Sequence, residues 1–213
     1  VEGLAEIAPG EGVLSEEGIQ ECPSTSAYWV VDPLDGTTNF AAGIPYWAIS
    51  IARFVDGEPS EAFLDIPSLR QRIVAIRGQG AWRNQKRLTP QSRAAAGSSC
   101  VSLCSRSIRV LQKRPDQSFP GKIRLLGVAS LNLVSVAMGQ TAGALEATPK
   151  IWDLAAAWLV LTELDCPLIW LGPHPAHLQP GRDLSEMGFP VVAAGSQKQL
   201  ERLAPWGESL LKG

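Results

Sequence analysis

Cysteine and histidine are scarce in this 213-residue chain, which has four cysteines and two histidines. Four thiols spread along the chain are too few and too far apart for the disulfide framework of a secreted scaffold, so we expect reduced thiols and a cytoplasmic protein. His174 and His177 lie in a proline-rich stretch rather than on a helix, which argues against a histidine metal pair. The sequence shows no convincing Ser-His-Asp or Cys-His arrangement for nucleophilic catalysis.

Long apolar runs and an excess of one charge are also missing. The best apolar run, Leu154 to Thr162, is flanked by acidic residues and is too short to cross a bilayer, and no signal peptide is evident. Lysine and arginine number 19 against 21 acidic residues, giving a net charge of −2, and the basic residues are scattered. We therefore expect neither a membrane nor a nucleic-acid polymer as a partner.

Apolar residues make up 45% of the chain, enough for one large domain or two closely packed halves. In the first half, apolar strands are predicted over 28–32, 46–54 and 61–66. Asp56-Gly57 is a typical hairpin turn, and a second hairpin should bend at 78–80. These signals predict an antiparallel sheet in the first half.

The second half has a different pattern. Apolar residues at helical spacing predict helices over 130–140, 153–164 and 197–204, and strands are predicted over 142–148 and 190–196. Alternating strands and helices are typical of βαβ units.

The polar stretch from Lys113 to Phe119 is the predicted break between these patterns. We therefore divide the chain into an N-terminal α+β half, residues 1–115, and a C-terminal α/β half, residues 116–213. The active site would need both halves.

The stretch WVVDPLDGTTNF, residues 29–40, places Asp32 and Asp35 on either side of a Pro-Leu pair after a buried strand. Residues three apart in a strand face opposite sides, so a turn is needed to bring both carboxylates together. Pro33 cannot donate to a strand ladder and should end the strand. Two carboxylates and the carbonyl of Leu34 would form an all-oxygen site suited to Mg²⁺. The alternative is a solvated turn in which the acids cap backbone groups.

Gly36 and Thr37 follow the acids and offer backbone N–H groups at a short helical turn. Such a turn can hold an anion, so cation ligands beside it indicate a phosphate bound by both.

The stretch DPLDGTTNF resembles the signature of the inositol monophosphatase family of Mg²⁺-dependent sugar phosphatases. LSEEG, upstream, resembles the family's Glu-Glu pair, and IWDLAAAW, downstream, resembles its C-terminal signature. The resemblance extends from about Leu4 to the C-terminus. It implies a layered αβαβα sandwich, two or three Mg²⁺ ions, inhibition by Li⁺, and a small phosphorylated substrate, and it makes a homodimer possible.

The same resemblance implies roles for individual residues. Glu16 would bind the catalytic Mg²⁺ and, with Thr37, would orient and deprotonate the attacking water. The other proposed metal ligands are Asp32, which would bridge two ions, the Leu34 carbonyl, Asp35 and Asp153. Gly36 and Thr37 would bind phosphate, and Glu146 would bind substrate hydroxyls. From the sequence alone, Asp153 would be an N-cap before an Ala-rich helix.

Two features depart from the family pattern. The chain begins only a short way before Glu16, and its first signal reads like the end of a helix, so we expect residues upstream of Val1. Val128 lies where inositol-specific members often carry a small hydroxyl residue. Phosphatases of the superfamily for fructose-1,6-bisphosphate, histidinol phosphate or a 3′-phosphonucleotide are therefore alternatives. The alternative of another class is a catalytically silent metal- or phosphate-binding protein.

Overall fold

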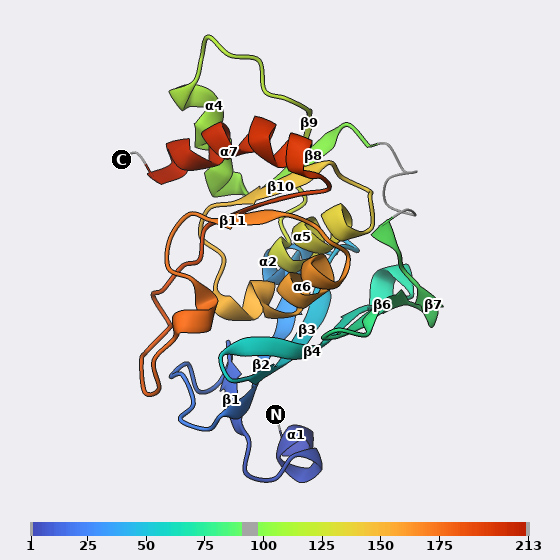
Figure 1. The fold of residues 1–213 in the computed structure, drawn as a ribbon, viewed down its shortest axis with the longest axis vertical. Coiled ribbons are helices and arrows are strands. Elements are labelled where there is room, and N and C mark those ends of the chain that lie inside the picture. The colour runs from blue at the N-terminus through green and yellow to red at the C-terminus, as the bar shows by residue number, and fades with distance from the viewer. Residues whose placement is uncertain (1, 91–97, 212–213) are drawn as a thin grey trace.

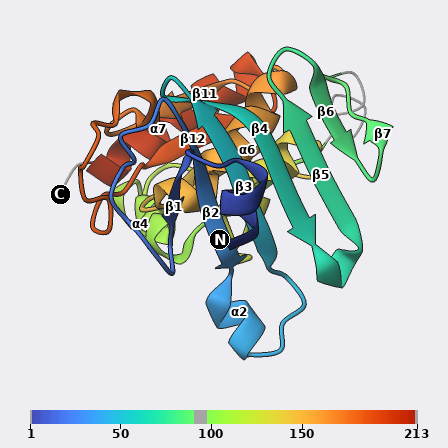
Figure 2. The ribbon, with the colours of Figure 1, turned by 90° about the horizontal axis from the view of Figure 1, so that it is seen from below.

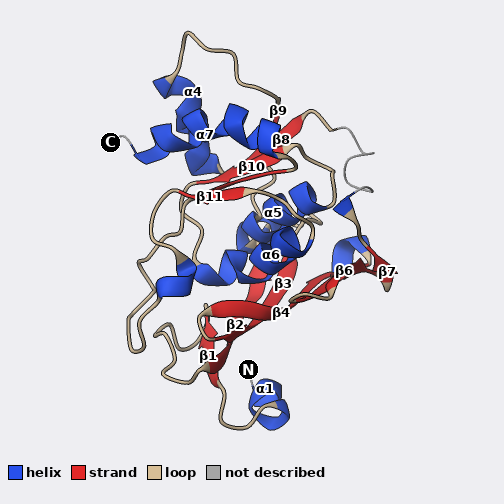
Figure 3. Cartoon of the chain, viewed as in Figure 1, coloured by secondary structure: helices blue, strands red, loops and turns tan. Residues whose placement is uncertain are grey.

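Two β-sheets with helices between and outside them make up the protein in a computed structural model (Figures 1 and 3), which describes residues 2–90 and 98–211. The first sheet has seven strands in chain order: β1 (Gly12–Ser15), β2 (Ala27–Asp35), β3 (Ala48–Val55), β4 (Glu58–Ile66), β5 (Gln71–Ile76), β6 (Gly80–Arg83) and β7 (Lys86–Arg87). The second sheet has the order β11 (Leu168–Trp170), β12 (Val191–Ala194), β10 (Gly143–Glu146), β8 (Cys100–Leu103) and β9 (Lys122–Arg124).

The helices form separate layers. The α-helices are α1 (Glu2–Ile7), α2 (Thr37–Ala41), α4 (Arg109–Lys113), α5 (Ala129–Ala137), α6 (Ile151–Glu163) and α7 (Gln197–Leu211). Short 3₁₀ turns are η1 (Pro67–Leu69), η2 (Ser105–Ile108) and η3 (Pro175–His177). Helices α5 and α6 lie between the two sheets, α4 and α7 cover the far side of the second sheet, and α1 lies beyond the first sheet (Figure 1). The layered α/β sandwich predicted from the sequence is confirmed.

Helices α5 and α6 are buried on nearly every side because they lie between the two sheets and pack against each other. Eight of the nine residues of α5 are buried, and so are nine of the thirteen residues of α6. One buried cluster joins residues of the first sheet, such as Phe54 and Leu64, to Leu154 of α6 and Val191 of β12. The two halves of the chain therefore share one core. None of the helices in the described part of the chain is long and apolar enough to cross a membrane.

The predicted hairpins are present. Strands β3 and β4 are antiparallel and turn at Asp56 and Gly57, both of which have positive φ (53° and 82°), as a two-residue type I′ hairpin loop requires. Strands β5 and β6 form the second hairpin.

The prediction of an antiparallel sheet is wrong at one edge, because β1 pairs with β2 in parallel, with Ser15 opposite Val31. Figure 2 looks onto this sheet and shows β1 running beside β2. Residues 16–26 carry the chain back to the starting end of β2, so both strands finish at the same edge. This geometry places Glu16 next to Asp32.

The chain leaves the first sheet after Arg87 and enters the second at Cys100. This change of sheet lies upstream of the polar stretch Lys113 to Phe119 that we predicted as the break. The division into halves at residue 115 stays a prediction. The second sheet is mixed, since β8 is parallel to β9 and β10 whereas β12 is antiparallel to β10 and β11.

Candidate active site

A bulge in β2 brings Asp32 and Asp35 to the same side of the sheet. Asp32 is opposite Ser50 of β3 and Asp35 is opposite Ala48, with a register shift between them. Both aspartates are buried, whereas Pro33 is exposed. Pro33 therefore does not end the strand as predicted. It lies in the irregular part of the ladder, where its missing N–H group costs no hydrogen bond.

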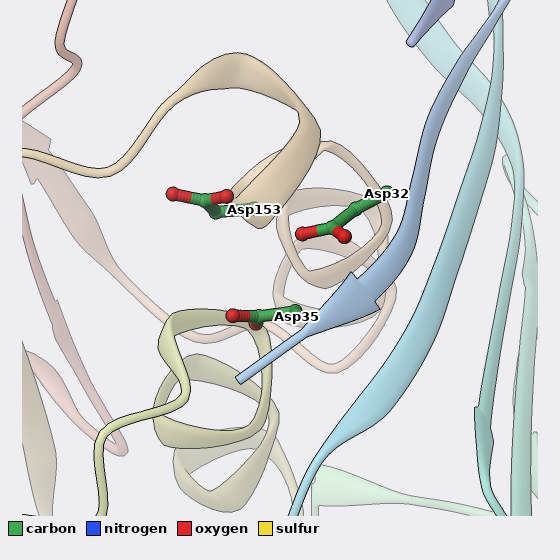
Figure 4. A group of neighbouring side chains, drawn as sticks. All are labelled: Asp32, Asp35 and Asp153. Carbon is green, nitrogen blue, oxygen red and sulfur yellow. The ribbon is translucent and has the colours of Figure 1, made fainter. Parts of the chain in front are cut away.

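Asp153, from the first turn of α6, completes a group of three carboxylates (Figure 4). One oxygen from each of Asp32, Asp35 and Asp153 lies within 4.8 Å of the others. The start of α6 is held there partly by Ser50, whose hydroxyl donates to the carbonyl of Trp152 at 3.3 Å. Because Ser50 is also the ladder partner of Asp32, this bond helps to set the helix start against the bulge.

Asp153 is the third residue of α6, because the helix begins at Ile151. Its Oδ2 accepts the N–H of Lys150, the N-cap residue, at 2.8 Å. The prediction of Asp153 as the N-cap itself is therefore wrong, although its carboxylate does satisfy a free backbone donor at the helix start.

The other two carboxylates are held by backbone groups. The N–H of Ser130, in the first turn of α5, donates to Oδ2 of Asp35 at 2.7 Å, and the N–H of Leu34 donates to Oδ1 of Asp32 at 2.9 Å. The other oxygen of Asp32, Oδ2, is buried, and no donor among the described residues is in hydrogen-bonding position for it, although the Asp153 carboxyl lies close enough to share a proton with Asp32. A buried carboxylate oxygen without a partner is unfavourable by about 1–3 kcal/mol or more, so this atom is suited to a ligand.

Burial raises the pKa of all three aspartates above its ordinary range. The negative charges of the neighbouring carboxylates raise the pKa of Asp32 and Asp153 further, and the Ser130 hydrogen bond opposes the rise at Asp35. None of the ion pairs found within residues 2–90 and 98–211 includes any of the three. A divalent cation would supply the positive charge that the protein does not.

Glu16 lies beside this group. Its backbone N–H donates to the carbonyl of Val31 at 3.2 Å, which continues the parallel pairing of β1 with β2. The half-buried carboxylate of Glu16 contributes to the raised pKa of Asp32, Asp35 and Asp153. The structure thus brings four sequence-predicted acids to one edge of the sheet.

The residues after the bulge form the short helix α2. Gly36 precedes it with φ +94°, a left-handed conformation. The Thr37 side chain is exposed, and its Oγ1 donates to the Leu34 carbonyl at 3.1 Å. Leu34 and Thr37 therefore lie together at the start of α2.

Replacing Gly36 by alanine should destabilise the fold by about 1–3 kcal/mol, because φ is positive and a Cβ would lie 2.7 Å from Cγ2 of Val128. Urea unfolding would measure the loss. Gly43 is the matched control, since it also has positive φ (+71°) but nothing lies within 4 Å of its Cβ position. Equal losses in Gly36→Ala and Gly43→Ala would show that contact with Val128 is unimportant.

Glu146, at the end of β10, is 2% exposed. Its Oε1 accepts a hydrogen bond from Nδ2 of Asn132 at 2.8 Å. Burial raises the pKa of Glu146, and the charges of Asp35 and Asp153 raise it further, whereas hydrogen bonds with Asn132 and Cys104 lower it. Glu146 is therefore close enough to the aspartates to interact with them electrostatically.

Sequence reasoning missed the contributions of α5. A polar Asn132 within the apolar stretch SLNLVSVA was the available signal, because a buried amide needs a partner. The backbone bond from Ser130 to Asp35 had no signal in the sequence, since every residue type except proline could donate it.

Comparison with known proteins gives one family. The model of the inositol monophosphatase family matches residues 1–205. An inositol-1-monophosphatase of Rhizobium meliloti (strain 1021) is 35% identical over 170 residues, which cover 76% of this chain and 64% of that protein. A histidinol-phosphatase of Mycobacterium tuberculosis is 35% identical over 185 residues, 80% of this chain and 71% of that protein. The chain thus spans less than two thirds of the Rhizobium relative.

Solved structures share the fold. Inositol monophosphatase II of Staphylococcus aureus MSSA476 has a TM-score of 0.78 at 25% identity, covering 99% of this chain and 81% of that chain. An IMPase/NADP phosphatase complexed with Mg²⁺ and phosphate has a TM-score of 0.74 at 24% identity, covering 95% and 76%.

Proposed function

The chain belongs to the inositol monophosphatase family, and from this premise we propose that it is a Mg²⁺-dependent phosphomonoesterase for a small sugar or polyol phosphate, such as inositol monophosphate. The reaction adds water to the ester and yields the free alcohol and inorganic phosphate. One observation carries the proposal: three carboxylates, two of them on buried residues, each place an oxygen within 4.8 Å of the others, and among the described residues no protein donor is in hydrogen-bonding position for Oδ2 of Asp32.

The donor set fits Mg²⁺. All the candidate ligands are oxygens, namely the carboxylates of Glu16, Asp32, Asp35 and Asp153 and the carbonyl of Leu34, and hard oxygen ligands favour Mg²⁺ over softer metals. When bound, the ions supply positive charge that lowers the pKa of a water and offsets charge on the phosphoryl oxygens. We propose two or three ions, as the family resemblance implies.

The protein's own groups would position the reactants. Because Oγ1 of Thr37 gives its proton to the Leu34 carbonyl, its lone pairs are free to accept from a water and to orient it. The Glu16 carboxylate would take the proton from that water. The N–H groups of Gly36 and Thr37 would bind the phosphate, and Glu146 would accept hydrogen bonds from substrate hydroxyls.

Finer points stay predictions. The substrate could instead be histidinol phosphate, fructose-1,6-bisphosphate or a 3′-phosphonucleotide, because the metal ligands would be the same. A cytoplasmic location stays a prediction from the small number of cysteines in the sequence. The homodimer and the inhibition by Li⁺ rest on the family resemblance alone.

A substrate panel tests the proposed function. Phosphate release should require Mg²⁺, should stop when EDTA is added, and should be fastest with one sugar or polyol phosphate among inositol 1-phosphate, histidinol phosphate, fructose-1,6-bisphosphate and a 3′-phosphonucleotide. LiCl should inhibit it. Binding of Mg²⁺ and phosphate without release from any substrate would favour the catalytically silent alternative.

A further inference from the structure

The backbone on both sides of Glu146 is fixed independently of its side chain. The Ser107 hydroxyl donates to the carbonyl of Leu145 at 2.9 Å, and the N–H of Cys104 donates to the same carbonyl at 3.3 Å. The N–H of Ala147 donates to Sγ of Cys104 at 3.4 Å. The end of β10 is therefore held by the segment 104–107. Losing the Asn132 contact would leave this backbone in place and would leave the Glu146 carboxylate with the Cys104 thiol as its remaining side-chain partner.

The Asn132 amide faces Glu146 with its nitrogen. Nδ2 donates to Oε1 of Glu146 at 2.8 Å, and this orientation suits the ionised carboxylate, which only accepts hydrogen bonds. Asn132 is fully buried, and its Oδ1 has no partner among the described residues. An unpaired buried oxygen in a helix lowers the stability of the folded protein by about 1–3 kcal/mol. An apolar residue would avoid this loss but would remove the donor from the buried Glu146 carboxylate, so the role of Asn132 lies in its contact with Glu146.

The same turn of α5 also holds a metal-site carboxylate. Ser130, two residues before Asn132, donates its backbone N–H to Asp35 at 2.7 Å. The first turn of α5 is closed by a helical hydrogen bond from the N–H of Asn132 to the carbonyl of Val128 at 2.9 Å. One rigid helical turn thus contacts the predicted metal site at Asp35 and the predicted substrate carboxylate at Glu146.

We propose that Asn132 is a positioning residue, which fixes the carboxylate of Glu146 at a set place relative to Asp35 and so selects substrates whose hydroxyls lie at a matching distance from the phosphate. The inference rests on the proposed function. It concerns the hydroxyl-bearing part of the substrate and not the hydrolysis of the phosphate itself.

Asn132→Leu tests it, because leucine keeps the branching pattern of asparagine, although it is larger, and removes the donor. We expect KM for inositol 1-phosphate to rise about tenfold with kcat little changed, since a small displacement of a binding group weakens a positioned contact. The KM for p-nitrophenyl phosphate, which has no hydroxyl for Glu146, should change less than about twofold. In a Glu146→Gln background, the rise in KM caused by Asn132→Leu should be smaller, because the effects of substitutions at two interacting residues are not additive.

Ser135→Ala is the matched control. Ser135 is buried in the same helix and bonds the Asn132 carbonyl and the Thr141 hydroxyl, both at 2.7 Å. Its removal should lower stability but should not change the KM for inositol 1-phosphate relative to the KM for p-nitrophenyl phosphate. Equal KM changes for both substrates in Asn132→Leu, or no change for either, would overturn the inference.

A binding measurement separates this inference from the proposed function. Titration calorimetry in the presence of Mg²⁺ should show that Asn132→Leu weakens the binding of inositol 1-phosphate and leaves the binding of inorganic phosphate unchanged. This result would support the positioning role even if the parent chain released no phosphate, and equal weakening of both ligands would overturn it.

Discussion

The Asp32→Asn protein should release phosphate at least about a thousandfold more slowly than the parent chain at saturating Mg²⁺. Within the described residues, Asp32 is the member of the carboxylate group that has a buried oxygen with no donor in hydrogen-bonding position. An amide in its place is a neutral and much weaker ligand for a hard cation. If Asp32 bridges two ions, as we propose, the single change would weaken both sites.

The same substitution should leave the fold intact. Oδ1 of Asp32 accepts the Leu34 N–H at 2.9 Å, and the amide oxygen of asparagine can accept the same bond. Asparagine also cannot ionise, so the cost of a buried charge beside the other carboxylates, which raises the pKa of Asp32, is absent from the variant. Without metal, Asp32→Asn should therefore unfold at an equal or higher temperature than the parent chain.

Asp65→Asn is a matched control for Asp32→Asn. Asp65 lies in β4 of the same sheet, is half-buried and pairs with Arg72 at 3.3 Å, away from the candidate site. It should keep near-normal phosphate release. Near-normal turnover by Asp32→Asn, or release by the parent chain without divalent cations, would contradict the proposed mechanism.

The extent to which the site could be predicted depended on how local each contact is. The pairing of Asp32 with Asp35 follows from one short stretch, because the residues that form the bulge are neighbours in the sequence. The bulge itself was missed, since a proline signals an interrupted ladder but does not say whether the strand ends or continues. The parallel edge strand was missed because hairpin signals describe only strands that are joined by short turns.

Contacts between distant segments had weaker signals. Asp153 could be connected with Asp32 only by the family resemblance, since nothing in its own stretch separates a metal ligand from a helix cap. The polar groups of α5 that hold Asp35 and Glu146 depend on how that helix is buried between two sheets. Burial on both faces is a property of the tertiary fold, and the periodicity of a single helix shows it incompletely.

Without metal, the protein should lose stability as the pH rises, and Mg²⁺ should restore it. Burial raises the pKa of Asp32, Asp35, Asp153 and Glu146 in the folded protein, whereas in the unfolded chain these groups have ordinary values of about 4. Between about pH 4 and the raised values, the folded protein keeps protons that the unfolded chain has released. The free energy of unfolding therefore decreases with rising pH, by about 1.4 kcal/mol per pH unit for each proton retained.

Mg²⁺ should reverse this trend because it binds the ionised carboxylates and competes with their protons. Thermal unfolding at about pH 5 and about pH 8, with EDTA or with Mg²⁺ at roughly a hundred times its Kd, would measure both effects. Binding of Mg²⁺ at that concentration should raise the free energy of unfolding by about 2.7 kcal/mol. The gain from Mg²⁺ should be larger at the higher pH and smaller in Asp32→Asn. A metal-free protein whose stability rises between these two pH values would show that the carboxylates already have a compensating positive charge, and the argument for a bound cation would then lose its physical basis.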